Sequence, residues 1–250
     1  GIYSKGIQSI AKELNKKHKV TVVAPDIQRS ACGHAITMHV PLMLQKVNID
    51  GLEGIDCYFT NGTPADCVKL GISQVIHGKP DLVVSGINNG ANAGSDILYS
   101  GTVSGALEGA ILGIRSFALS IDNFMPKHIN DAAGFFCDFL EQYSTDTYDI
   151  NIVLNINFPD IPLTKVKGIA AVPQGITKYT EEFKERNHPR GYTYFWLSGE
   201  LEAPKEKDPD TDIKLLKNGY IVVTPLQYNL TDEKYLNILS EKIKNIHICK

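Results

Sequence analysis

A loop rich in glycine and asparagine joins an apolar stretch to an amphipathic one between residues 81 and 113. The apolar run 82–84 is typical of a buried parallel strand. The small polar cluster 100–102 comes directly before apolar residues that recur with helical spacing. Unpaired N–H groups and the helix dipole make the start of a helix attractive to phosphate. We therefore predict that an anion binds to Ser100, Gly101, Thr102 and Ser104.

Further polar side chains are expected at the same edge of the sheet. Asn88 and Asn92 lie in the loop that follows the apolar run, and Ser30 lies in a polar loop after the short apolar run 20–24. Ligands of open α/β sheets bind beyond the carboxyl ends of the strands, where such loops meet. The alternative is that the asparagine-rich loop only turns the chain and that Thr102 only caps a helix. The loop is longer and more polar than a turn requires.

Short apolar runs alternate with helical patterns over the first 160 residues. This alternation predicts an α/β fold with a Rossmann-like, mostly parallel sheet, flanking helices and right-handed crossovers. Residues 36–49 alternate loosely and predict one or two further strands, and Pro41 favours the edge of the sheet. Thr63, Pro64 and Asp66 have the types and spacing of a helix start. The expected strands are 20–24, 56–60, 82–84, 116–120 and 152–157, and the expected helices are 7–14, 63–76, 102–113 and 132–140.

The pattern changes after Pro159. Two expected strands, 168–173 and 220–224, are separated by a charged irregular segment (178–189), an aromatic run (192–197) and a polar tract (202–212). Alternating aromatic residues predict a protruding β-arm. A last helix is expected after an N-cap at Thr231. We therefore predict a core, 1–160, that carries the site, and a C-terminal segment, 161–250.

Composition limits the classes of function. The chain has 250 residues and a net charge of −3, which argues against nucleic acid as a partner because phosphate backbones need clustered Lys and Arg. No stretch reaches the roughly 18 apolar residues of a membrane span, so no membrane partner is expected. The five cysteines are scattered without a Cys-x-x-Cys pair, which fits a reducing compartment and predicts a cytoplasmic protein.

Four segments of the chain resemble the survival protein E (SurE) family of nucleotidases. They are VVAPDIQRSACGH at 22–34, GTPADCVK at 62–69, DLVVSGINNGANAG at 81–94 and YSGTVSGALEG at 99–109, with weaker likeness at 154–157 and 219–226. The resemblance spans nearly the whole chain. It implies a metal-dependent phosphomonoesterase (a 5′/3′-nucleotidase) that hydrolyses nucleoside 5′- and 3′-monophosphates and in some members short polyphosphate.

The resemblance also implies a metal site. Ser30 and Asn88 correspond to two ligands of the family's divalent ion, and Gly1 corresponds to the glycine of its Asn-Asp-Asp-Gly motif. The first strand and both aspartates are therefore expected just upstream of Gly1, so the chain as numbered carries no catalytic carboxylates of that pair. Two carboxylates, a hydroxyl and an amide oxygen suit Mg²⁺ or Mn²⁺. Asn92 is a further candidate donor to phosphate.

The family resemblance implies a homodimer or homotetramer, with the 192–197 arm and the C-terminal helix reaching into neighbouring subunits. Two other functions remain open at this point. One is a dinucleotide-dependent oxidoreductase, against which no Gly-x-Gly-x-x-Gly opens a helix. The other is a nucleotide-binding protein without catalysis. Asp96 is a minor candidate for the site, and the spacing of His34 and His39 does not favour zinc.

Overall fold

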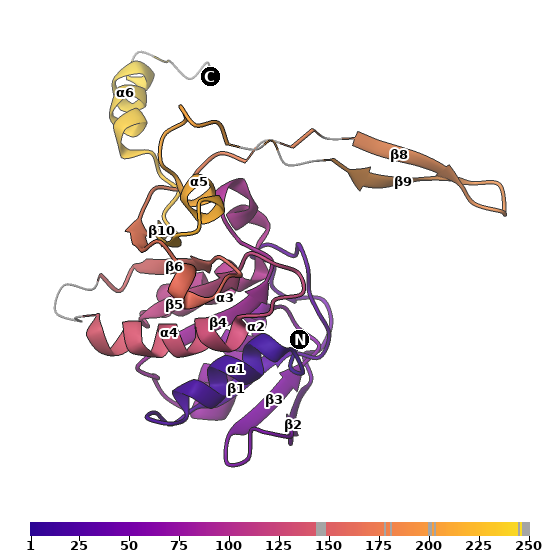
Figure 1. The fold of residues 1–250 in the computed structure, drawn as a ribbon. Coiled ribbons are helices and arrows are strands. Elements are labelled where there is room, and N and C mark those ends of the chain that lie inside the picture. Colours follow the sequence, from indigo (N-terminus) through magenta and orange to yellow (C-terminus); the bar gives the residue numbers. More distant parts are fainter. Residues whose placement is uncertain are drawn as a thin grey trace.

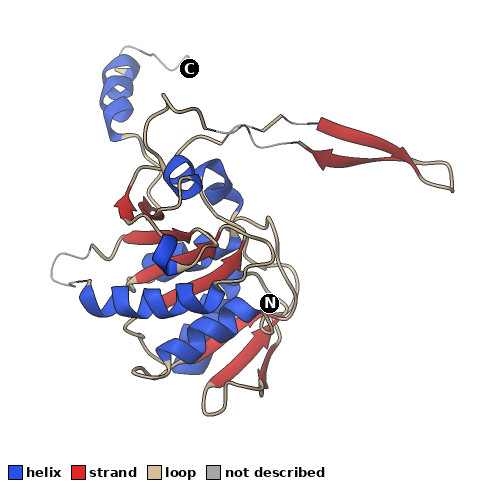
Figure 2. Cartoon of the chain, viewed as in Figure 1, coloured by secondary structure: helices blue, strands red, loops and turns tan. Residues whose placement is uncertain are grey.

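Alternating strands and helices build an α/β body, from which a β-hairpin and a C-terminal helix extend (Figures 1 and 2). The computed structural model describes residues 1–143, 149–177, 179–180, 182–199, 202, 204–244 and 246. No helix within these ranges is both long enough and apolar enough to cross a membrane. The predicted fold class is confirmed, and the division at residue 160 stays a prediction.

The strands of the body form two sheets. In the first, β1 (Thr21–Pro25) pairs in parallel with β3 (Asp56–Thr60), and β2 (Leu44–Val47) lies antiparallel at the outer edge. The loosely alternating residues 36–49 thus contain one strand. The remainder of this segment forms no ladder, and several of its apolar residues, such as Met38, are exposed.

The second sheet has the order β4-β5-β6-β10-β7. Its parallel part consists of β4, β5 and β6, while β10 runs antiparallel to β6 and parallel to β7. The bounds are β4 (Val83–Asn89), β5 (Ser116–Ile121), β6 (Ile152–Phe158), β7 (Ile169–Ala171) and β10 (Ile221–Gln227).

Helices cover both faces of the sheets. α1 (Lys5–Leu14) and α4 (Ile129–Gln142) lie on one face, and α2 (Pro64–Leu70) and α3 (Gly101–Ile111) pack on the other. Gly6 allows α1 to approach β4 closely, since a Cβ at this position would lie 1.8 Å from the Ile87 carbonyl oxygen. Shorter helical segments are η1 (Gly71–Ile76), η2 (Gly94–Tyr99), η3 (Leu163–Lys165) and α5 (Asp212–Lys217).

Two helix starts test the sequence patterns. In α2 the Thr63 hydroxyl accepts from the Asp66 amide at 3.2 Å, and the Asp66 carboxylate accepts from the Thr63 amide at 2.9 Å, which confirms the predicted start. In α3 the N-cap is Ser100, whose hydroxyl accepts from Val103 N at 3.1 Å, so Thr102 already belongs to the first turn.

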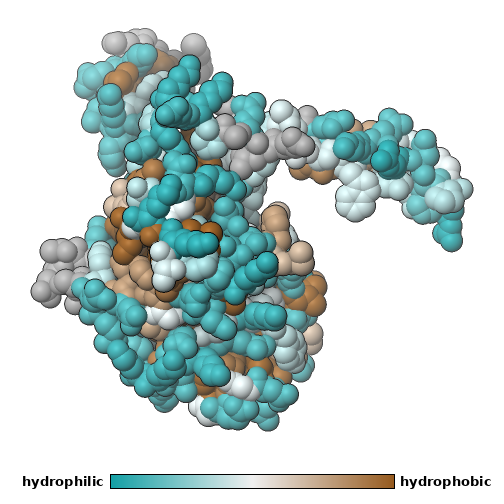
Figure 3. Space-filling model, viewed as in Figure 1, coloured by the Kyte–Doolittle hydropathy of each residue, from teal (hydrophilic) through white to brown (hydrophobic). Residues whose placement is uncertain are grey.

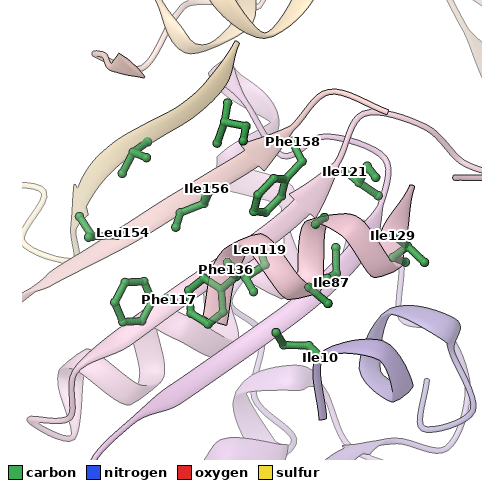
Figure 4. Close-up of a cluster of buried hydrophobic side chains, with 14 of the residues drawn as sticks. Ile10, Ile87, Phe117, Leu119, Ile121, Ile129, Phe136, Leu154, Ile156 and Phe158 are labelled. Carbon is green, nitrogen blue, oxygen red and sulfur yellow. The ribbon is translucent and has the colours of Figure 1, made fainter. Parts of the chain in front are cut away.

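The core of the body lies between the second sheet and the pair α1 and α4 (Figure 4). Phe117 and Leu119 of β5 face this layer, whereas Ala118 between them faces α3, as the alternation of a strand requires. Phe117 packs edge-on against Phe136 of α4, with ring centroids 5.3 Å apart. Ile111 was expected on the buried face of α3 but is 46% exposed. Eight residues at about 100° each turn it by about 80° from Val103.

The β-arm is a two-stranded hairpin, β8 (Glu182–Asn187) with β9 (Thr193–Ser198), which extends far from the body (Figure 1). The prediction of an irregular segment over 178–189 was wrong for β8, while Lys178 and Glu181 lie outside the described residues. The last helix, α6 (Glu233–Ile243), is capped by Asp232, whose carboxylate accepts from Tyr235 N at 2.8 Å. The predicted cap at Thr231 was therefore one residue early.

The described cysteines are free thiols, and Cys249 lies outside the described residues. Burial raises the pKa of Cys67 to about 12, with the neighbouring Asp66 acting in the same direction. Such a thiol stays protonated at neutral pH, which fits a small core hydrophobe.

Asp212 fastens the C-terminal segment to the loop after β4. Its fully buried carboxylate accepts from three backbone amides, those of Gly94, Gly175 and Ile213, each at 2.8 Å. Two reciprocal bonds beside it join Ser95 to Thr177, at 2.9 and 3.1 Å. The loop that precedes α3 is therefore held by residues that are about 80 to 120 positions later in the chain.

We expect Asp212→Ala to lower the free energy of unfolding by about 3 kcal/mol or more. Three buried N–H groups would lose their acceptor, and each unsatisfied group costs about 1–3 kcal/mol. Urea unfolding followed by circular dichroism measures the change. Asp210→Ala is the control, because Asp210 is 66% exposed and its loss should stay within about 0.5 kcal/mol. Equal stability of the two variants would contradict this account.

Candidate functional site

One cavity of about 1540 Å³ lies at the carboxyl ends of β1 and β4 and continues between these two strands. The predicted residues Ser30, Asn88, Asn92 and 100–102 all line it. The cavity is therefore lined by residues from three segments: the loop after β1, the end of β4 with the loop that follows it, and the first turn of α3. Ser104 is the exception, since it is buried within α3 and lies outside this lining.

The loop that carries Ser30 is tied to its surroundings on the β1 side. The carboxylate of Asp26, directly after β1, accepts from the Ile27 amide at 2.8 Å and from Arg29 at 3.0 Å. Arg29 also donates to the Asn61 carbonyl at 2.7 Å. The Ser30 hydroxyl is exposed and accepts from the Gln28 side chain at 2.8 Å, so its lone pairs and proton remain accessible from the cavity.

The same loop packs against the start of α3. The Gly33 amide donates to the Tyr99 carbonyl at 2.9 Å. A Cβ at Gly101 would lie 2.9 Å from the Cys32 sulfur and 3.0 Å from a ring carbon of Pro64, so this close contact depends on glycine. Ser30 is thereby held near the first turn of α3.

Asn88 is the second-to-last residue of β4, and its side chain has a defined orientation. Its amide nitrogen donates to the backbone carbonyls of Asn89 at 3.2 Å and Gly90 at 2.8 Å. These bonds fix which end of the amide is the nitrogen, and they turn Oδ1 away from both carbonyls. The oxygen is then the atom of Asn88 that suits a cation.

Asn92 takes part in a buried polar network at the end of the second sheet. Its backbone N–H donates to the Asn157 side chain at 2.8 Å, and its backbone carbonyl accepts from the Asn155 side chain at 2.8 Å. Its side-chain nitrogen donates to the Ser120 hydroxyl at 2.7 Å. Asn155 and Asn157 are fully buried on β6. The side-chain nitrogen that was predicted to bind phosphate is thus engaged with Ser120, although the residue lines the cavity.

The first turn of α3 presents backbone amides to the cavity. The Ser100 hydroxyl is used as the N-cap, and the Ser104 hydroxyl donates to the Ser100 carbonyl at 2.7 Å. The N–H groups of the first helical positions, Gly101 and Thr102, have no intrahelical acceptor. An anion here would therefore meet backbone N–H groups and Thr102, and not the hydroxyls of Ser100 and Ser104.

A hard divalent ion prefers oxygen ligands, and the hydroxyl of Ser30 and the amide oxygen of Asn88 could serve as two uncharged ones. Within the described ranges, no group of three or more His, Cys, Asp or Glu side chains could hold a metal ion. The cavity runs along both β1 and β4. All of residues 20–25 and 81–92 line it, and Gly1 lies at the same end as Ser30.

The minor candidates have other partners. Tyr179 donates to the Asp96 carboxylate at 2.5 Å, and burial followed by this bond raises the pKa of Tyr179 to about 12. Asp96 lines the cavity in this paired form. The His34 ring contacts Glu108, and His39 is exposed.

Sequence reasoning missed two buried carboxylates, Glu108 and Asp212. Glu108 falls inside a segment that was quoted for its resemblance, and Asp212 closes the polar tract 202–212. Periodicity gives no signal for either residue, because their partners come from distant elements. A Glu within an otherwise small and apolar helix was the one available signal.

Comparisons with known proteins find relatives over nearly the full length of the chain. The family described as "Survival protein SurE" matches residues 1–181. The protein named 5′-nucleotidase SurE from Thermosipho africanus is 44% identical over 245 residues, which cover 98% of this chain and 95% of that protein. The protein of the same name from Crocosphaera subtropica is 41% identical over 93% of this chain and 87% of its own.

A solved structure is also similar. The crystal structure of SurE from Aquifex aeolicus superimposes with a TM-score of 0.82 at 36% identity, covering 97% of this chain and 96% of that one. Sequence and fold thus agree over nearly the full length. The chain belongs to the SurE family.

Proposed function

We propose that this protein is a metal-dependent phosphomonoesterase that hydrolyses nucleoside 5′-monophosphates to nucleoside and phosphate. Relatives at 40–44% identity are named 5′-nucleotidase SurE. The observation that carries the proposal is the convergence of Ser30, Asn88 and the first turn of α3 on one cavity. Nucleoside 3′-monophosphates and short polyphosphate are further proposed substrates.

Different groups of the chain would bind the metal ion and the phosphoryl group. Ser30 and Asn88 would hold a divalent ion, Mg²⁺ or Mn²⁺, through neutral oxygens. The amides at Gly101 and Thr102 would bind the non-bridging oxygens of the phosphoryl group, where negative charge gathers during transfer. When bound, such an ion polarises a phosphoryl oxygen or activates a water.

The missing carboxylates are proposed to come from a strand that precedes Gly1 and lies between β1 and β4. Both strands are at the ends of their sheets and leave one backbone edge unpaired toward the cavity. Ile2 donates to the Pro25 carbonyl at 2.8 Å, so Gly1 lies at the carboxyl end of β1. A parallel strand that ends there would lead through a short loop into α1, and α1 into β1, as a right-handed crossover does.

A reducing compartment, the cytoplasm, fits the free thiols of the described cysteines. The proposal includes this location.

We also propose that the protein is a homodimer or homotetramer in which the hairpin and α6 contact other subunits. No residue of α6 is buried, and Tyr235, Ile238 and Leu239 are 40–54% exposed. Figure 3 shows some brown, apolar surface among the teal residues in this part of the molecule. An 11-residue helix and a two-stranded hairpin are both marginal without tertiary contacts. A second copy of the chain would supply these contacts.

Phosphate release should require a divalent ion when the protein includes the residues upstream of Gly1. EDTA should abolish the activity, and Mn²⁺ or Mg²⁺ should restore it. Ser30→Ala and Asn88→Ala should each lower kcat/KM by about 10–100-fold, as the loss of one metal ligand or its support does. A malachite-green assay on nucleoside monophosphates measures the rate.

Ser9→Ala is the control, because Ser9 contacts only Asn130 on the outer surface among the described residues. Activity that survives EDTA would contradict the proposal. Nucleotide binding without turnover would select the non-catalytic function, and tight NAD binding would select the oxidoreductase.

The oligomer proposal predicts that Ile238→Glu with Leu239→Glu dissociates the assembly. Two charges would replace apolar contacts, and sedimentation velocity would show a species with the mass of one chain. Lys242→Glu, also on α6, should leave the mass unchanged. A wild-type protein that sediments as a monomer at micromolar concentration would be incompatible with the proposal.

A further inference from the structure

Glu108 of α3 is a buried carboxylate with two basic neighbours. Its side chain is 4% exposed, and its Oε2 lies 3.0 Å from His34 Nε2. Lys69 Nζ lies 2.6 Å from Oε1. The lysine contact is an ion pair and not a directed hydrogen bond, since Oε1 accepts none from any described residue. Burying a carboxylate is costly unless such partners compensate for its lost hydration.

The three side chains connect three elements that surround the candidate site. His34 comes from the loop after β1, Lys69 from α2, and Glu108 from the helix whose first turn is the proposed phosphate site. The histidine is four residues beyond Ser30, and its ring faces Glu108. His34 therefore joins the end of the Ser30 loop to α3 and is not among the residues that line the cavity.

Ser30 depends on such connections for its position. Its hydroxyl contacts Gln28, two residues away in the same loop, and this bond cannot fix the loop relative to α3. Arg29 holds the loop on the side of β1 through the Asn61 carbonyl. On the side of α3, the loop is held by the Gly33 amide on Tyr99 and by His34 on Glu108.

We propose that His34 and Glu108 are positioning residues that fix the separation between Ser30 and the first turn of α3. Lys69 forms an ion pair with Glu108 in its buried place. The separation matters because one phosphoryl group has to meet both the ion on Ser30 and the amides at Gly101 and Thr102. For its activity measurements, this inference rests on the proposed nucleotidase function.

The test compares two substitutions of one residue in the full-length protein. His34→Ala removes the contact with Glu108. In His34→Gln, the side-chain amide of the glutamine can still donate a hydrogen bond to the Glu108 carboxylate. The alanine variant should need more Mn²⁺ for half-maximal activation and should lose about tenfold or more in kcat/KM. The glutamine variant should stay within about threefold of wild type, since the loop keeps its connection.

His128→Ala is the matched control. His128 makes a comparable contact, Nδ1 to Asp131 at 2.9 Å, before α4 and outside the cavity. The His128→Ala variant should leave both kcat/KM and the Mn²⁺ concentration for half-maximal activation unchanged. If His34→Ala does not fold, His34→Asn replaces it, because asparagine is too short to reach Glu108.

Hydrogen exchange separates this inference from the proposed function. The Gly33 amide is bonded to Tyr99, so exchange over residues 30–34 should be faster in His34→Ala and unchanged in His34→Gln. This readout holds even if wild-type protein releases no phosphate, a result that would overturn the function alone. Wild-type exchange and kinetics in His34→Ala, or equal losses in both His34 variants, would overturn the positioning role.

Discussion

Two strand edges that have no neighbouring strand among the described residues determine the arrangement of this protein. β1 and β4 are each the last strand of a sheet, and each turns a row of backbone N–H and C=O groups toward the same cavity. Buried backbone groups need partners, and an open edge is a place where another strand pairs. One added strand would make a single continuous sheet of the two. The strand proposed above would end at Gly1, at the same end of β1 as Ser30, so that it would complete both the sheet and the proposed site.

The remaining parts of the site are held by buried polar contacts at the carboxyl ends of the strands. The Asp212 carboxylate accepts hydrogen bonds from three backbone amides, one of them that of Gly94. The asparagine side chains of β6 bond to the backbone of Asn92. These bonds fix the loop that follows β4. Fully satisfied networks of this kind make a loop rigid, and a rigid loop can hold ligand groups in place before a substrate arrives.

The sequence predicted the body well because buried strands and helix starts have strong local patterns. The runs 116–120 and 152–157 are apolar, and Thr63 with Asp66 forms its capping box from neighbouring residues. β8 was missed because all of its residues are exposed and charged or polar ones dominate, so no alternation marks it. For the candidate site, the predicted ends of the strands were enough to place Ser30 and Asn88 at the same edge, and both line the cavity. The Ser104 hydroxyl and the Asn92 side-chain amide instead bond to Ser100 and Ser120 inside the protein, and no local sequence pattern specifies these partners.

The balance of charge explains why a cation from solution suits this cavity. A phosphate monoester is close to a dianion at neutral pH, whereas the start of one helix offers only about half a positive charge. Two cationic side chains near the site are already paired, Arg29 with Asp26 and Lys69 with Glu108. Ser30 and Asn88 contribute neutral oxygens. Carboxylates from an added strand would make the cavity more negative still, and a divalent ion would then be needed to hold both them and the substrate.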